Sequence, residues 1–162
     1  MQHNDPPVEV HPGVFIGSIA SLDHLETAGI DAIINLSGRC YQNTRSVLNI
    51  VMEDIPVTFD TIELYVKKFT IGVAAIEVAL EQGKKVLVHC AAGINRSATL
   101  IAFYLLEKGL SYDETVNLLE SANRKRRVDL LTNPTFRSIL KMHYVLKKNF
   151  PSRSEAFKKL NV

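Results

Sequence analysis

The sequence predicts a three-layer α/β domain in which a central, mainly parallel sheet of four or five strands is flanked by helices. Short runs of consecutive apolar residues, many of them β-branched, are typical of strands that are buried on both faces. Between these runs, apolar residues recur at steps of three and four, which is typical of helices. The alternation of the two patterns favours a parallel sheet covered on both faces.

Length and composition fit one globular domain. The chain has 162 residues, of which 46% are hydrophobic and 22% are charged, as is ordinary for soluble globular proteins. We expect a single domain over residues 1–150 and a weakly ordered tail over residues 151–162. The net charge of +2 gives no reason to expect a nucleic-acid partner.

The first part of the chain alternates short strands with a helix. An apolar run at 14–16 predicts a strand, and residues 18–28 predict a helix that ends at Gly29. The β-branched run 32–36 predicts the next strand, and 48–52 predicts another.

The second part is mostly helical. A helix over 62–80 is predicted by an apolar face formed by Ile62, Tyr65, Phe69, Val73, Ile76 and Leu80. The run 86–88 predicts the last strand. A helix starting near Ser97 is apolar all round, so we expect it to be buried in the middle of the fold. Two further helices are predicted over 113–124 and 133–148.

The most informative segment joins strand 86–88 to the buried helix. It reads His89, Cys90, Ala91, Ala92, Gly93, Ile94, Asn95, Arg96 and Ser97. Small residues at a strand-to-helix turn let backbone N–H groups converge on one point, where the helix adds its positive end. Arg96 supplies a planar fork of donors for two phosphate oxygens. The field that binds phosphate also favours the thiolate form of Cys90.

This constellation indicates a phosphate-ester hydrolase that works through a cysteinyl-phosphate. Cys90 is the expected nucleophile, and Arg96 is expected to hold the phosphate oxygens in the transition state. Ser97 is expected to donate a hydrogen bond to the thiolate, although capping the helix is an equally good interpretation. For His89 we favour orienting the loop through a buried hydrogen bond over proton transfer.

At these residues the chain resembles the cysteine-dependent dual-specificity phosphatases of the protein tyrosine phosphatase superfamily. The superfamily signature His-Cys-x5-Arg-Ser/Thr is met by His89, Cys90, Arg96 and Ser97. The resemblance extends from residues 7–8 through 35–37 to 133–136. It implies a phosphoprotein substrate, carrying phosphotyrosine or phosphoserine/threonine, held in a shallow pocket. The thiolate chemistry needs no metal, and we expect no cofactor.

The resemblance also implies a carboxylic acid on a loop about thirty residues before the cysteine, which protonates the leaving group and later deprotonates water. Asp60 lies thirty positions before Cys90, although the position expected from the helix phase falls nearer Phe59. Asp54 is the competitor if the loop carries an insertion. Asp60 also fits an N-cap of the following helix, with Glu63 closing a capping box. We favour Asp60 as the acid.

Other candidate residues have simpler interpretations. Asn133-Pro134 resembles a family motif that supports the phosphate cradle, but a proline at a helix start explains it equally well. The basic run 124–127 fits a solvated helix end, with a second anion site as the minority alternative. Cys40 follows a strand and fits a bystander thiol. No Cys/His cluster has the spacing of a metal site.

Several features of the chain indicate a protein of a reducing compartment. Its two cysteines cannot form a secreted disulfide framework, and residues 1–7 lack the features of a signal peptide. The longest apolar run, 98–106, is too short to span a bilayer. We therefore expect a cytoplasmic or nuclear protein with no membrane partner, in an oligomeric state that the sequence leaves open.

Three rival functions fit parts of the pattern. The first is the same chemistry on a phosphoinositide or an RNA 5′-triphosphate, which the uncharged loop interior disfavours. The second is a non-catalytic phosphate-binding module, against which the intact Cys90 argues. The third is a rhodanese-type sulfur transferase, which a thiosulfate assay would distinguish.

Overall fold

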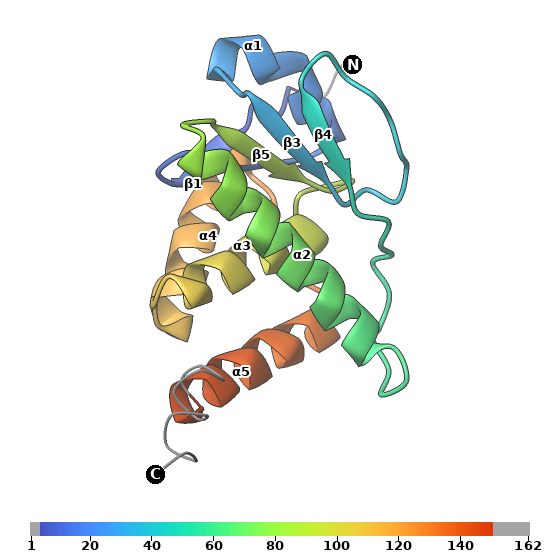
Figure 1. Cartoon of the computed structure of the whole chain (residues 1–162), viewed down its shortest axis with the longest axis vertical. Coiled ribbons are helices and arrows are strands. Elements are labelled where there is room, and N and C mark those ends of the chain that lie inside the picture. Colours follow the sequence, from blue (N-terminus) through green and yellow to red (C-terminus); the bar gives the residue numbers. More distant parts are fainter. Residues whose placement is uncertain (1–3, 151–162) are drawn as a thin grey trace.

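A single five-stranded sheet forms the centre of the molecule (Figure 1). The computed structural model describes residues 4–150, so the predicted tail at 151–162 lies outside the described residues. The strands are β1 (Val8–His11), β2 (Val14–Gly17), β3 (Ala32–Asn35), β4 (Ser46–Asn49) and β5 (Val86–His89). Their order is β1-β2-β5-β3-β4, and every neighbouring pair is parallel except β1 with β2. The predicted α/β fold with a mainly parallel sheet is confirmed.

Two strands differ from the expectation. The strand predicted over 48–52 is β4, which ends at Asn49 because β3, its only partner along this stretch, ends opposite at Asn35. After β4 the chain leaves the sheet, but Ile50 and Met52 remain buried at 7% and 2% exposure while Val51 between them is exposed, so the apolar pattern continues past the strand. Strand β1 was not predicted because its four residues are mostly half-exposed; it pairs with β2 as a short hairpin.

Helices cover both faces of the sheet, and Figure 1 shows the larger helical layer on one side and α1 on the other. The larger layer consists of α2 (Ile62–Glu81), α3 (Arg96–Glu107), α4 (Tyr112–Arg126) and α5 (Pro134–Asn149). The opposite face is covered by a 3-10 helix, Ile19–His24, that continues into one turn of α-helix, α1 (Leu25–Ala28). The predicted helix over 18–28 therefore exists mainly as a 3-10 helix and ends, as expected, at Gly29.

Side chains of alternate strand residues pack into two separate hydrophobic cores, one on each face of the sheet. Ile16, Ile34 and Val88 point into the large core shared with α2 to α5, whereas Ile33 and Leu87 join the smaller core beneath α1. This alternation is the period-2 geometry of a sheet buried on both faces.

Helix α3 runs through the large core, as the sequence predicted. Every residue from Arg96 to Leu106 is buried. Helix α2 approaches it closely at Gly72, where an added Cβ would lie 2.5 Å from a methyl carbon of Leu100. Such packing fixes the start of α3 and with it the loop that precedes the helix. Within residues 4–150, no helix has the length and apolar character needed to cross a bilayer.

Candidate active site

The loop formed by residues 90–95 connects the end of β5 to the start of α3. Strand β5 is the central strand, paired in parallel with β2 and with β3. Parallel sheets bind their ligands at the carboxyl ends of the strands, and this loop lies at that end. The structure brings Cys90, Arg96 and Ser97 together there, as the sequence predicted.

Cys90 is held as a hydrogen-bond acceptor at the base of the loop. Its side chain is buried, the Ser97 hydroxyl lies 3.3 Å from Sγ, and the Gly93 N–H donates to Sγ at 3.2 Å. Burial alone would raise the pKa of the Cys90 thiol. Hydrogen bonds from the Ser97 hydroxyl and backbone, the charge of Arg96 and the Gly93 N–H outweigh it, so the pKa is lowered from its ordinary value. The site therefore favours a thiolate.

This shift predicts the pH dependence of alkylation. Because the pKa is lowered, the thiolate persists as the pH falls, and iodoacetate inactivation should have its midpoint clearly below the ~8.5 of a free cysteine. The measurement is the inactivation rate against pH in a Cys40→Ser background, since Cys40 is the exposed thiol of the pair. Ser97→Ala should move the midpoint upward. A midpoint at or above the free-cysteine value would contradict the electrostatic argument.

Ser97 does not cap α3. The N-cap residue is Asn95, and Ser97 is the second residue inside the helix. Its buried hydroxyl is directed at the Cys90 sulfur instead. The capping interpretation is therefore wrong, and the contact with the thiolate is the one that the structure shows.

Arg96, at the end of the loop, has one N–H group without a hydrogen-bond acceptor among residues 4–150. It is the first residue of α3 and only 8% exposed, and its Nη1 group donates to the Met52 carbonyl at 3.0 Å. Its Nε–H is buried, and no acceptor for it exists among residues 4–150. A buried guanidinium N–H without a partner is unfavourable. An anion that entered the loop would satisfy it.

His89 supports the loop from behind. Its Nε2 lies 2.6 Å from the Tyr41 hydroxyl, and its Nδ1 lies 3.1 Å from the Cys90 carbonyl. Burial lowers the pKa of His89, as does the charge of Arg96, while the bond to the Cys90 carbonyl opposes both. Burial raises the pKa of Tyr41 to about 12, so its hydroxyl stays protonated.

These groups assign the tautomer of a neutral His89. The Tyr41 hydroxyl donates to Nε2, and the Nδ1–H donates to the Cys90 carbonyl. Both ring nitrogens are thus engaged in holding the loop, which is the orienting arrangement rather than a proton shuttle. The sequence did not point to Tyr41, since a tyrosine in a loop carries no local signal of this contact.

Asp54 is joined to the loop through two asparagines. Its Oδ2 accepts from the Asn95 amide at 2.8 Å, and its Oδ1 accepts from the Asn133 amide at 3.0 Å. The Asn133 N–H donates in turn to the Asn95 side-chain oxygen at 3.0 Å. Asn133 is also the N-cap of α5, with Pro134 as the first helical residue. The helix-start interpretation of Asn133-Pro134 is therefore confirmed, and Asn133 also contacts Asn95 of the loop.

Asp60 has a different position. It is exposed in the turn before α2, and no hydrogen bond or ion pair within residues 4–150 joins it to the loop. The N-cap of α2 is Thr61, which makes no side-chain capping bond to the helix. The predicted N-cap at Asp60 with a capping box to Glu63 is therefore wrong. The structure links Asp54, and not Asp60, to the loop of residues 90–95, which we call the phosphate loop.

The basic run 124–127 is not uniformly solvated. Arg124, Lys125 and Arg127 are exposed, but the side chain of Arg126 is fully buried and reaches the phosphate loop. The interpretation of this run as a solvated helix end is wrong for Arg126. Sequence reasoning missed this residue because its contacts with the loop lie more than thirty positions away along the chain.

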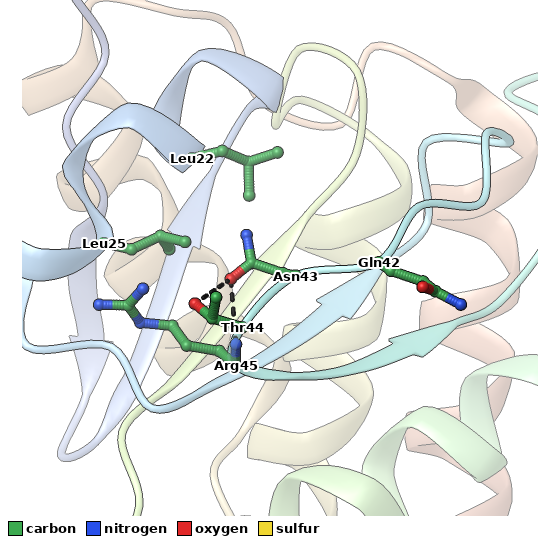
Figure 2. Close-up of a pocket in the computed structure, with 6 residues that line it drawn as sticks. All are labelled: Leu22, Leu25, Gln42, Asn43, Thr44 and Arg45. Carbon is green, nitrogen blue, oxygen red and sulfur yellow. Dashed lines mark hydrogen bonds between the residues drawn. The ribbon is translucent and has the colours of Figure 1, made fainter.

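The surface next to the loop is partly hollowed. Ala91 and Ala92 are exposed, and they border a hollow of about 470 Å³ next to the loop. Figure 2 shows a different hollow, of about 570 Å³, lined by Leu22, Leu25, Gln42, Asn43, Thr44 and Arg45. None of the predicted site residues lines it. No group of His, Cys, Asp and Glu side chains within residues 4–150 has the arrangement of a metal site.

Comparisons with known proteins agree with this geometry. Residues 14–146 match the family model described as "Dual specificity phosphatase, catalytic domain". The human protein "Dual specificity protein phosphatase 2" is 34% identical over 104 residues, which cover 62% of this chain and 32% of that protein. The chain thus spans about a third of that relative's length. "Dual specificity protein phosphatase OPG106" of vaccinia virus is 32% identical over 119 residues, covering 72% of this chain and 68% of that protein.

A solved structure shows the same fold. The crystal structure of human DUSP28 superposes with a TM-score of 0.73 at 27% sequence identity. The match covers 88% of this chain and 95% of that one. The similarity thus extends over nearly the whole length of both chains.

Proposed function

The chain belongs to the dual-specificity phosphatase family, and from this premise we propose that it hydrolyses phosphate monoesters on phosphoproteins through a cysteinyl-phosphate intermediate. The substrates are phosphotyrosine and phosphoserine or phosphothreonine side chains. The observation that carries the proposal is the Cys90 sulfur, held by Ser97 and Gly93 next to the unfilled Nε–H of Arg96. A nucleophile and an anion-binding donor are thus positioned at one loop.

The geometry supports a two-step displacement. The Cys90 thiolate attacks phosphorus in line with the ester oxygen, so the S–P bond forms as the P–O bond to the leaving group breaks. Arg96 and the loop N–H groups stabilise the charge on the equatorial oxygens. The departing oxygen takes a proton from the Asp60 carboxyl group. Water then attacks the phosphorus and gives a proton back to the Asp60 carboxylate as the S–P bond breaks. The Ser97 hydroxyl stabilises the thiolate that departs in this second step.

The shape and charge of the loop support short phosphorylated side chains as substrates. Ala91 and Ala92 are exposed and have small side chains, which supports a site that admits phosphoserine as well as phosphotyrosine. Of the residues between Cys90 and Arg96, none is basic, which disfavours polyanionic phosphoinositides and RNA 5′-triphosphates. We also propose a reducing compartment, the cytoplasm or nucleus, because the catalytic thiol must stay reduced.

A substrate panel tests this function. The protein should release phosphate from p-nitrophenyl phosphate, from phosphotyrosine peptides and from phosphoserine or phosphothreonine peptides, and should transfer no sulfur from thiosulfate. Phosphate release only from a phosphoinositide or a 5′-triphosphate RNA would overturn the assignment of phosphoproteins. Sulfur transfer without phosphate release would overturn the phosphatase itself.

We further propose different roles for the two aspartates. Both carboxylate oxygens of Asp54 already accept amide N–H groups, which fits a residue that holds Asn95 and Asn133 in place. Asp60 lies on an exposed turn, and no hydrogen bond within residues 4–150 holds its carboxyl group in a supporting role. We therefore retain Asp60 as the general acid and assign Asp54 to positioning the loop.

The choice of leaving group separates these roles. A general acid matters most when the departing oxygen is basic. Asp60→Asn should lose on the order of 10²–10⁴-fold in kcat on phosphoserine peptides and much less on p-nitrophenyl phosphate. It should also remove the limb of the pH–rate profile that reports the acid. The measurement is kcat on both substrates across pH.

Asp54→Asn is the matched comparison. A positioning residue affects every substrate alike, so this variant should slow both substrates by a similar factor. A leaving-group effect at Asp54 with none at Asp60 would reverse the assignment. Two variants without a leaving-group effect would show that neither carboxylate is the acid.

A further inference from the structure

The side chain of Arg126, at the end of α4, is completely engaged beneath the phosphate loop. Its five N–H donors meet five acceptors. Nε and Nη2 donate to the two carboxylate oxygens of Asp5 at 2.9 and 2.7 Å. Nη1 donates to the Gly93 carbonyl and to the Asn123 side-chain oxygen, at 2.9 Å each. Nη2 also donates to the Ala92 carbonyl at 3.0 Å. The side chain is 0% exposed. This arginine has no donor left for a substrate.

The two carbonyl contacts orient the amide groups of the loop. A trans peptide is planar, so the C=O of one residue and the N–H of the next point in opposite directions. When Arg126 holds the Ala92 carbonyl, the Gly93 N–H faces the other way, where it donates to the Cys90 sulfur at 3.2 Å. When it holds the Gly93 carbonyl, the Ile94 N–H is directed away from Arg126 in the same manner.

The guanidinium of Arg126 packs closely against the backbone of Gly93. Gly93 has a φ of +69°, and an added Cβ would lie 2.5 Å from both terminal nitrogens of Arg126. The Asn123 amide donates a further bond to the Gly93 carbonyl at 3.1 Å. Any change in the position of the guanidinium is therefore transmitted directly to the loop.

Asp5 fixes the other side of the guanidinium. It supplies the counter-charge that a buried arginine requires. Asp5 is itself anchored, because its carboxylate accepts from the Ser18 hydroxyl and its carbonyl accepts from the Ser21 hydroxyl at 2.6 Å. The segment before β1 thus completes the attachment of α4 to the loop.

We propose that Arg126 and Asp5 form a positioning pair that holds the backbone N–H groups of the phosphate loop toward the thiolate and the bound phosphate. The pair acts through the Ala92 and Gly93 carbonyls and does not touch the substrate. This role rests on the proposed function, because it concerns the same loop and the same reaction.

Arg126→Lys tests the pair at constant charge. A single ammonium cannot reproduce five directed donors, so the loop amides should lose their fixed orientation. We expect kcat on p-nitrophenyl phosphate to fall by about 10²-fold, as for a misplacement of about 1 Å. The pH midpoint of Cys90 alkylation should rise, because the Gly93 N–H no longer donates steadily to the sulfur. Inhibition by inorganic phosphate should weaken. All measurements use the full chain in a Cys40→Ser background.

Two further variants complete the test. Asp5→Asn keeps the shape of the partner and removes its charge, and it should change the same three quantities in the same direction by a smaller factor. In combination with Arg126→Lys its effect should be less than additive, since both act through one contact. Lys125→Met, at an exposed position in the same basic run, should change none of them.

The outcomes distinguish positioning from a purely structural role. If both variants lower the melting temperature but leave kcat, the alkylation midpoint and phosphate inhibition of the folded protein at wild-type values, the proposal is overturned. If Arg126→Lys does not fold, Asp5→Asn decides by the same criteria. Alkylation and phosphate binding require no turnover. A wild-type protein without phosphatase activity would therefore refute the proposed function while these readouts still judge the pair.

Discussion

Replacement of Cys90 by serine is expected to abolish hydrolysis of p-nitrophenyl phosphate, with a loss of at least about 10⁴-fold in kcat. A serine hydroxyl is not ionised at neutral pH, so it lacks the nucleophilicity of the thiolate that the site stabilises. The loop N–H groups and Arg96 remain in place, so the variant should still bind a phosphotyrosine peptide. The measurements are steady-state turnover and peptide binding on the same protein preparation.

Cys40→Ser is the matched control. Cys40 is the exposed cysteine and, among residues 4–150, makes no hydrogen bond to the loop, so its replacement should leave kcat unchanged. Vanadate, which mimics five-coordinate phosphorus, should inhibit the wild type, and EDTA should not. A Cys90→Ser variant that kept a substantial part of the wild-type rate would rule out covalent catalysis at this residue.

The parts of the site that could be predicted from sequence are those built from adjacent residues. A strand, a loop of small residues and a buried helix follow one another between Val86 and Glu107. Local periodicity and the spacing of Cys90 and Arg96 within that loop were therefore enough to place both residues. The buried character of α3 could also be predicted, because its apolar residues surround the helix axis. Such features need no knowledge of how distant segments pack.

The parts that could not be predicted depend on distant segments. Asp54 meets Asn133 across 79 positions and Arg126 meets Asp5 across 121 positions, and no local pattern encodes such contacts. Arg126 is part of a basic run that, from sequence alone, is best explained by solvation and the helix dipole. The end of β4 likewise depends on its partner β3, whose last paired residue is Asn35.

The remaining large effect is expected for Arg96→Lys, which should lower kcat/KM on p-nitrophenyl phosphate by about 10³-fold or more, comparable with the loss of an oxyanion donor. The guanidinium uses its donors on two sides: Nη1 donates to the Met52 carbonyl at 3.0 Å, and the buried Nε–H is left for phosphate. The single ammonium of lysine cannot serve a carbonyl on one side and a phosphate on the other in this geometry.

Two comparisons show whether the loss of activity in Arg96→Lys comes from losing the planar guanidinium donors or from a change in charge. Because lysine keeps the positive charge, the alkylation midpoint of Cys90 should move less in Arg96→Lys than in Arg96→Met, whereas both should lose most of their turnover. Arg124→Lys, an exchange of the same kind at an exposed site on α4, should retain wild-type kcat and phosphate inhibition. If Arg96→Lys kept within about threefold of the wild-type rate, a point charge would be sufficient. The unfilled Nε–H would then have no part in holding the transferred phosphoryl group.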